Sequence, residues 1–125
     1  MLYDEKWART AVPVEAPLKR YQELLLRAAD IIEEKGWARG EWQTNSGAVC
    51  LLGAMGIAHN GRPYFAFRGF TYRRARAAMA RYLCEVEHAE RLCLNMVICA
   101  NWNDDDARSN AHVISSLRAA ARYGV

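Results

Sequence analysis

The sequence predicts an all-α fold, a compact single-domain bundle of about five helices. Apolar residues recur at intervals of three and four along several segments, which is the period of an amphipathic helix. Glycines and helix-capping residues separate these segments by short connections, and no convincing pair of strand-like segments is present. At 125 residues, the chain is long enough to bury a core without disulfide or metal staples.

Composition narrows the class of protein further. Hydrophobic residues make up 52% of the chain and charged residues 25%, which is the balance of an ordinary globular domain. No segment approaches the ~20 apolar residues of a membrane span, and the start, MLYDEKWART, lacks the pattern of a secretory signal. We therefore expect a cytoplasmic protein without membrane contact, whose four cysteines are free thiols. The net charge of +3 permits an acidic partner without requiring one.

The chain divides into an N-terminal arm, residues 1–16, and a single helical domain, residues 17–125. The arm shows no sustained hydrophobic period. The first helix is predicted over residues 17–35, because Pro17 suits a first helical turn and Gly36 suits the position just past a helix end. The apolar stripe of this helix consists of Leu18, Tyr21, Leu25, Ala28, Ala29 and Ile32.

A loop and a buried second helix are expected next. Trp37 and Trp42 should pin the loop, and the helix should begin near Ser46 and include the segment CLLGAMGIAH. Because this segment has almost no polar face, we expect it to be buried. Gly53 and Gly56 each lower its helix propensity by about 1 kcal/mol, which predicts the close approach of another helix.

The aromatic segment RPYFAFRGF, within residues 62–71, is expected to be irregular, with a β-hairpin as the alternative. A third helix is predicted over residues 71–84, with Thr71 as its cap. A fourth helix, residues 88–100, is expected to form the centre of the core. The last helix is predicted over residues 110–123, with Ser109 as its N-cap.

Three consecutive aspartates in the segment NWNDDDARSNAH, residues 101–112, raise the question of a metal site. A calcium loop is excluded by spacing, because Asp106 falls where the turn needs Gly and His112 where a bidentate Glu is required. We interpret the aspartates as negative charge near the positive end of the last helix, and Trp102 as a core anchor. A divalent-metal or acid–base role for Asp104 and Asp105 is the alternative.

Cys50 is the thiol whose position best suits catalysis. It falls near the start of the second helix, where the helix dipole would lower the pKa of a cysteine and favour the thiolate. The uniformly apolar context favours a buried, inert cysteine instead. A cysteine enzyme would draw its remaining groups from His59, His88, His112, Asn103 and Asp104.

A zinc site is the other candidate built on cysteine. Cys84, His88 and Cys93 are close in sequence, and Cys84 and His88 have i, i+4 spacing. Neither a CxxC nor a CxxH motif is present, so we expect no metal and no cofactor.

The main candidate for a functional surface is a run of arginines interleaved with aromatic residues between Arg62 and Arg81. Arginines beside exposed aromatics suit an acidic protein surface or a nucleic-acid strand. Alternatively, the aromatics close the core and the arginines form a solvated helix face, paired with Glu85, Glu87 and Glu90. The predicted partner-binding residues are Arg62, Tyr64, Phe67, Arg68, Arg73, Arg74 and Arg81.

Three segments taken together resemble a small uncharacterised helical family of actinobacteria and their phages. They are LLRAADIIEEKGWARGEW, CLLGAMGIA and the stretch that runs from Ile98 through NWNDDDARSNAH to Ala120. The WND motif before a capped helix carries the resemblance most specifically, although Asp105 and Asp106 depart from the shorter turn of the family pattern. The resemblance implies the fold and a phage or actinobacterial source, and it implies no active site.

We therefore expect a small cytoplasmic interaction protein that is not an enzyme and binds a host or phage protein through the arginine and aromatic surface. Nucleic-acid binding by the same surface is the first alternative, and a Cys50-dependent enzyme is the second. A homodimer through the apolar second helix or unburied aromatics is also compatible with the sequence.

Overall fold

The computed structural model describes residues 17–63 and 69–124. The predicted all-α class is confirmed: these residues form a compact bundle of five α-helices and contain no strand. The N-terminal arm and residues 64–68 lie outside the described residues, so the alternative of a hairpin there stays open. None of the described helices is long and apolar enough to cross a membrane. The helices are α2 (Arg20–Lys35), α3 (Leu51–Asn60), α4 (Phe70–Glu85), α5 (Asn95–Asn101) and α6 (Asn110–Arg122).

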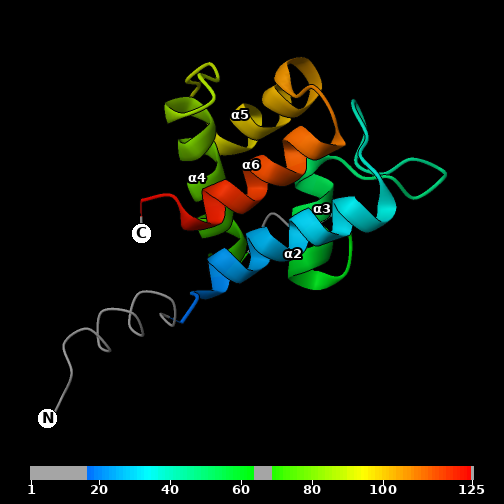
Figure 1. Ribbon diagram of the computed structural model, residues 1–125, viewed down its shortest axis with the longest axis horizontal. Coiled ribbons are helices and arrows are strands. Elements are labelled where there is room, and N and C mark those ends of the chain that lie inside the picture. Colours follow the sequence, from blue (N-terminus) through cyan, green and yellow to red (C-terminus); the bar gives the residue numbers. More distant parts are fainter. Residues whose placement is uncertain (1–16, 64–68, 125) are drawn as a thin grey trace, which may run out of the picture.

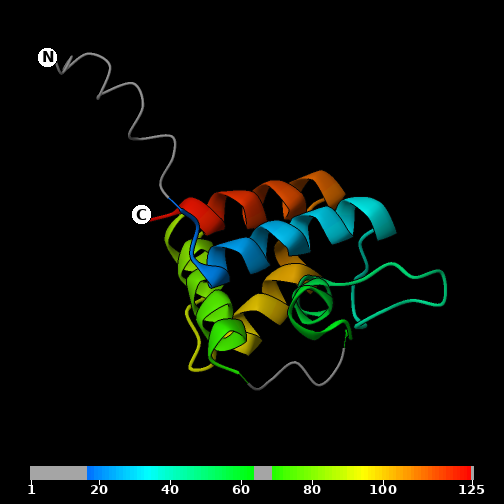
Figure 2. The same cartoon turned by 90° about the horizontal axis from the view of Figure 1, so that it is seen from below.

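Helix α2 is the element around which the others pack. It runs beside α6 along its length and also contacts α3 and α4 (Figure 1). Seen after a 90° turn, α2 and α6 form one layer, α3 and α5 lie beneath it, and α4 crosses one end of both (Figure 2). The loop between α2 and α3 extends from the opposite end of the bundle.

The first helix begins three residues later than predicted. Lys19 is its N-cap, and the backbone N–H of Lys19 donates to Oε1 of Gln22 at 2.7 Å, so the first turn closes on a side chain. Gln22 is buried, and its Nε2 donates to the carbonyl of Ala121 in α6 at 2.8 Å. The end at Gly36 is confirmed, with φ of 95° at that residue.

Helix α3 is buried as predicted, but it begins at Leu51 rather than near Ser46. The residues before it stay extended because Val49 exchanges backbone hydrogen bonds with the loop: its N–H donates to Gly36 at 2.9 Å and its carbonyl accepts from Ala38 at 3.0 Å. The segment that requires a glycine at position 53 also differs from the predicted one. A Cβ at Gly53 would lie 2.4 Å from the carbonyl oxygen of Trp42, so a loop, and not another helix, approaches closely there.

The helices in the second half differ from prediction mainly at their starts. Helix α4 begins at Phe70 with Gly69 as N-cap, so Thr71 lies inside the first turn and does not cap it. The helix predicted over residues 88–100 is wrong in its first part, because α5 begins only at Asn95. His88 has a positive φ of 61°, which ends the turn after α4, and Leu94 is 60% exposed.

The sequence WNDDD continues α5 as a π-helix, Trp102–Asp106, labelled η2. The predicted last helix is confirmed: Ser109 is the N-cap of α6, and its Oγ accepts from the N–H of His112 at 3.2 Å. Trp102 is 1% exposed, which confirms its role as a core anchor. The buried residues of α6 are Val113, Ile114, Ser116, Leu117, Ala120 and Ala121.

Gly53→Ala tests the close approach of the loop to α3. In an open helix this change stabilises a protein by up to about 1 kcal/mol, but here the added methyl group meets the carbonyl of Trp42. We expect Gly53→Ala to lower the free energy of unfolding by roughly 1–3 kcal/mol, measured by urea denaturation. Ala119→Gly, at an exposed position of α6, calibrates helix propensity in the same protein. A more stable Gly53→Ala variant would contradict the packing described.

Candidate functional site

The turn after α5 organises one end of the molecule. The backbone N–H of Ala107 donates to the carbonyl of Trp102 at 2.8 Å, which closes a turn of the wider π type. The wider turn places Trp102 and Asn103 in adjacent buried positions, at 1% exposure each. Such turns recur at functional sites, and Asn103 is the buried polar residue of this turn.

The carboxamide of Asn103 uses all four of its usual hydrogen-bonding positions. Its Oδ1 accepts from the indole Nε1 of Trp37 at 2.7 Å and from the backbone N–H of Leu51 at 3.0 Å. Its Nδ2 donates to the carbonyl of Ala38 at 3.1 Å and to Oδ1 of Asp104 at 2.9 Å. A carboxamide supplies two acceptor and two donor positions on one planar group, so Asn103 joins the loop after α2 to the first residue of α3.

Asp104 has a specific partner, whereas the carboxylates of Asp105 and Asp106 have no hydrogen-bond partner among the described residues. Its Oδ1 also accepts from the backbone N–H of Gly40 at 2.9 Å. Arg39 adds a further link, because its Nη2 donates to the carbonyl of Ala107 and its guanidinium lies 4.8 Å from the centroid of the Trp37 ring. Asp104 therefore does more than place negative charge near the start of α6: its carboxylate holds the loop.

His112 and Glu87 form a second polar cluster behind Trp102. Nδ1 of His112 accepts from the backbone N–H of Arg108 at 3.1 Å, which leaves Nε2 to donate to Oε1 of Glu87 at 2.9 Å. Oε2 of Glu87 accepts from the hydroxyl of Ser116 at 2.9 Å. Glu87 therefore ties the segment after α4 to α6, and it pairs with none of the described arginines, contrary to one expectation from the sequence.

Cys50 lies beside this junction and lines a small pocket of ≈ 160 Å³ together with Trp42, Leu52, Asn103 and Asp104. Cys50 is the N-cap of α3, and its Sγ accepts from the N–H of Gly53 at 3.2 Å. Burial nevertheless raises the pKa of the thiol, and the negative charge of Asp104 raises it further. The backbone N–H groups at the helix start do lower the pKa of Cys50, as expected, but burial outweighs them and the pKa is raised.

Among the described residues, no hydrogen bond joins Cys50 to any of the three histidines considered as its partners. His112 bonds to Glu87, and the ring of His59 packs against that of Tyr72 with centroids 5.6 Å apart. The zinc candidates do not form a site either: within residues 17–63 and 69–124, no three His, Cys, Asp or Glu side chains are placed to hold a metal ion.

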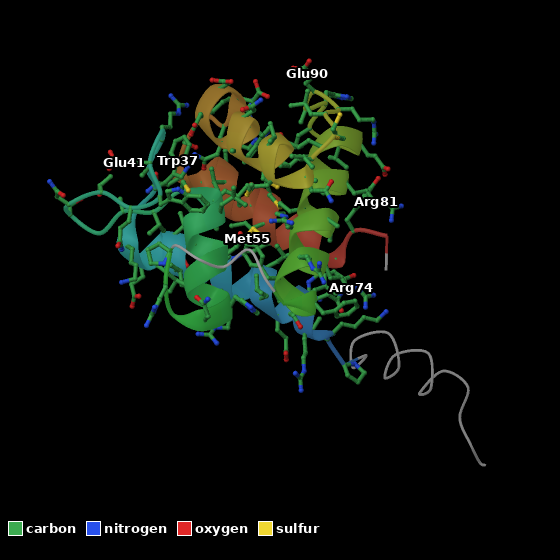
Figure 3. All side chains as sticks on the ribbon, turned by 180° about the vertical axis from the view of Figure 1, so that it is seen from behind. Trp37, Glu41, Met55, Arg74, Arg81 and Glu90 are labelled. Carbon is green, nitrogen blue, oxygen red and sulfur yellow. The ribbon has the colours of Figure 1, made fainter. Side chains whose placement is uncertain are left out.

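The predicted partner-binding surface lies on the other side of the bundle. Tyr64, Phe67 and Arg68 lie outside the described residues, so no contact of theirs is known. The four described members, Arg62, Arg73, Arg74 and Arg81, are all exposed. Figure 3 shows Arg74 and Arg81 on the same side of α4, two turns apart, with Arg74 beside the start of α2.

The arginines of α4 lie over tyrosines of neighbouring segments. The Arg74 guanidinium is 4.7 Å from the ring centroid of Tyr21, and that of Arg81 is 5.4 Å from the ring centroid of Tyr123. Arg81 also pairs with Glu85 at 3.4 Å, as expected for a solvated helix face. Arg81 thus behaves as part of a solvated, ion-paired helix face. Arg74 has no carboxylate partner among the described residues, as a binding surface would require.

Arg76 differs from the other arginines of α4 because it points inward. Its Nε is buried without a hydrogen-bond partner, and its guanidinium lies 5.5 Å from the ring centroid of Tyr72. Tyr72 is fully buried, and burial raises the pKa of its hydroxyl to about 12. Tyr72 is therefore part of the interior, whereas Arg76 is half-buried and only its Nε is enclosed.

Lys19 and Arg20 are surface residues that the sequence did not single out for binding, whereas Phe70 belongs to the aromatic segment that it did. They join Arg74, Tyr21 and Thr71 in lining a groove of ≈ 440 Å³ where α2 and α4 begin. Phe70 is 71% exposed. This groove could not be predicted from the sequence, because Lys19 and Arg20 lie at the start of α2 and no local pattern shows that the starts of α2 and α4 lie side by side.

The fold and these contacts define a small helical domain in which one buried asparagine joins the last part of the chain to the loop after the first helix. The chain belongs to a family of unknown function, DUF6197, and the match spans residues 16–123. No curated protein and no solved structure matches the chain.

Replacing Asn103 by a residue of similar size tests its role directly. Asn103→Leu leaves the Trp37 indole, the Leu51 amide and the Ala38 carbonyl without their partner. We expect the free energy of unfolding to fall by about 3 kcal/mol or more, measured by urea denaturation. Asp105→Asn, an exposed change in the same turn, should stay within about 0.5 kcal/mol of wild type. Equal effects of the two changes would rule out a special role for Asn103.

The environment of Cys50 predicts slow alkylation. Because the thiolate is the reactive form and the pKa is raised, Cys50 stays protonated at neutral pH, and its rate should climb only as the pH approaches the raised pKa. With iodoacetamide at pH 7.5, Cys50 should react at least about tenfold more slowly than the exposed Cys93, as read by peptide mass spectrometry. Preferential labelling of Cys50 in the native protein would instead favour the cysteine-enzyme alternative.

Proposed function

We propose that this protein is a non-enzymatic interaction protein that binds another protein through the basic face of α4. We define this face by Arg73, Arg74 and Arg81 together with Phe70. The observation that carries the proposal is the exposure of these four side chains on one helix. An exposed aromatic among cations is typical of contact surfaces, in which Arg and Phe are enriched.

The stacking of Arg74 and Arg81 on tyrosines supports the same proposal. A guanidinium held over a ring has lost part of its rotamer freedom before any partner arrives, so less entropy is lost on binding. The raised pKa of Cys50, the thiol whose position best suits catalysis, also favours binding over a cysteine-dependent reaction. The partner in this proposal is a protein of the host or of a phage, and the protein acts in the cytoplasm of an actinobacterial cell, as the resemblance of the sequence suggests.

Nucleic-acid binding by the same face is the competing proposal. Its support is the combination of arginines and an exposed aromatic ring, which can contact phosphates and stack on a base. The two proposals differ in their response to salt, because each phosphate contact releases counterions and steepens the fall of affinity with salt concentration.

The proposal is tested by capturing partners with the immobilised full chain from an actinobacterial lysate. Arg74→Glu combined with Arg81→Glu should reduce recovery of a specific protein by about tenfold or more, read by quantitative mass spectrometry. The fold should survive, because the Arg81–Glu85 pair is exposed to solvent and exposed ion pairs contribute little to stability. Arg27→Glu combined with Arg108→Glu makes the same change in net charge at exposed positions outside the face.

Unchanged recovery with the Arg74 and Arg81 variant would count against this face as the binding surface. Recovery of nucleic acid instead of protein, with affinity that falls steeply between low and physiological salt, would favour the competing proposal.

A further inference from the structure

The groove where α2 and α4 begin contains three positive side chains that no carboxylate of the described residues neutralises. Its lining includes Lys19, Arg20 and Arg74 and no carboxylate. Glu23, in the first turn of α2, is exposed and lies outside the lining. None of the three cations forms an ion pair with a described residue, whereas Arg118 pairs with both Asp30 and Glu33 at 3.1 Å. Within residues 17–63 and 69–124, nothing offsets the charge of these three side chains, so the groove favours an anionic ligand.

The start of α4 adds to this potential. Its N-cap is Gly69, which offers no side chain to the free backbone N–H groups, and its first turn contains no acidic residue. The N-terminal end of a helix carries a partial positive charge that is normally offset by such groups. At this end of α4, the helix and the side chains of the groove thus favour the same sign of ligand.

The groove also has an apolar part. Phe70 is 71% exposed at its edge, and the Tyr21 ring is half-buried beneath the guanidinium of Arg74 at 4.7 Å. A ligand that covers Phe70 would remove its ring from water while its acidic groups reach the three cations. The complementary ligand is therefore acidic with at least one apolar side chain.

We propose that this groove binds an acidic peptide segment of the protein partner, in which Asp or Glu residues flank an apolar side chain. The proposal rests on the proposed function and names the chemistry of the partner. A nucleic-acid strand fits less well. It carries a charge on every nucleotide, and proteins that bind it present a long basic groove along its backbone. Here three cations without a carboxylate partner among the described residues line one groove, and two turns further along α4 the charge of Arg81 is already paired with Glu85.

The test is a titration of the isotope-labelled full chain with a short probe peptide, followed by amide NMR shifts. The probe carries glutamates on both sides of a Leu-Phe pair, and its matched control replaces every glutamate by glutamine. We expect shifts at Lys19, Arg20, Phe70, Thr71 and Arg74 with the acidic probe, and affinity at least about tenfold lower for the glutamine control. Equal binding of the two peptides, or shifts spread over unrelated arginines, would overturn the proposal.

Lys19→Glu combined with Arg20→Glu is the informative variant. It should preserve the fold, because acidic residues are favourable at a helix start and the Lys19 backbone contact with Gln22 does not involve the replaced side chains. The variant should bind the acidic probe at least about tenfold more weakly, whereas Arg27→Glu combined with Arg108→Glu should bind it as wild type does. Unchanged binding by the groove variant, or preferential binding of oligothymidine over the probe, would refute the groove as an acidic-peptide site.

The same variant separates this proposal from the proposed function. If Lys19→Glu with Arg20→Glu still captures the protein partner while Arg74→Glu with Arg81→Glu does not, the basic face of α4 stands and the groove proposal fails. If both variants lose the partner and the groove variant also loses the probe, the groove proposal is supported.

Discussion

The hydrogen bonds of the Asn103 carboxamide are the constraint on which one half of the structure depends. The loop between α2 and α3 has little regular structure of its own, and its buried polar groups need partners from elsewhere. Asn103 supplies them to Trp37, Ala38 and Leu51 at once. By fixing the first residue of α3, the same group sets where the apolar helix enters the core and where Gly53 meets the loop. The WND motif is thus structural: Trp102 is buried in the core, Asn103 joins the loop to α3, and the carboxylate of Asp104 accepts from Gly40.

Local patterns in the sequence were sufficient for much of the fold. The apolar stripes of α2, α4 and α6 and the cap at Ser109 involve residues a few positions apart, so their helices could be predicted with small errors at the ends. The role of Asn103 could not, because its partners Trp37 and Leu51 are 66 and 52 positions away. The same limit applies to residues 86–94, where the apolar period continues but Glu87 bonds to His112 and Ser116 of α6. The candidate surface was foreseen only along α4, since Lys19 and Arg20 come to it from another helix.

The proposed binding face and the Asn103 junction occupy different parts of the bundle, and this separation is useful. Buried hydrogen-bond networks restrict substitution, whereas exposed arginines over tyrosines can change with little effect on stability. Helix α4 connects the two regions: Tyr72 and Met79 lie in the core, while Arg74 and Arg81 remain outside. A partner could therefore be recognised by a surface whose side chains vary while the WND junction keeps the helices in place.

Native-state hydrogen exchange of the Trp37 indole and the Leu51 amide tests the role of Asn103 most directly. Both protons are donated to the same oxygen, at 2.7 and 3.0 Å for the donor–acceptor pairs. If the carboxamide holds the loop onto α3, the two protons exchange with the same, large protection, close to that of the core helices. Exchange of either proton as fast as that of an exposed loop amide would contradict the junction described.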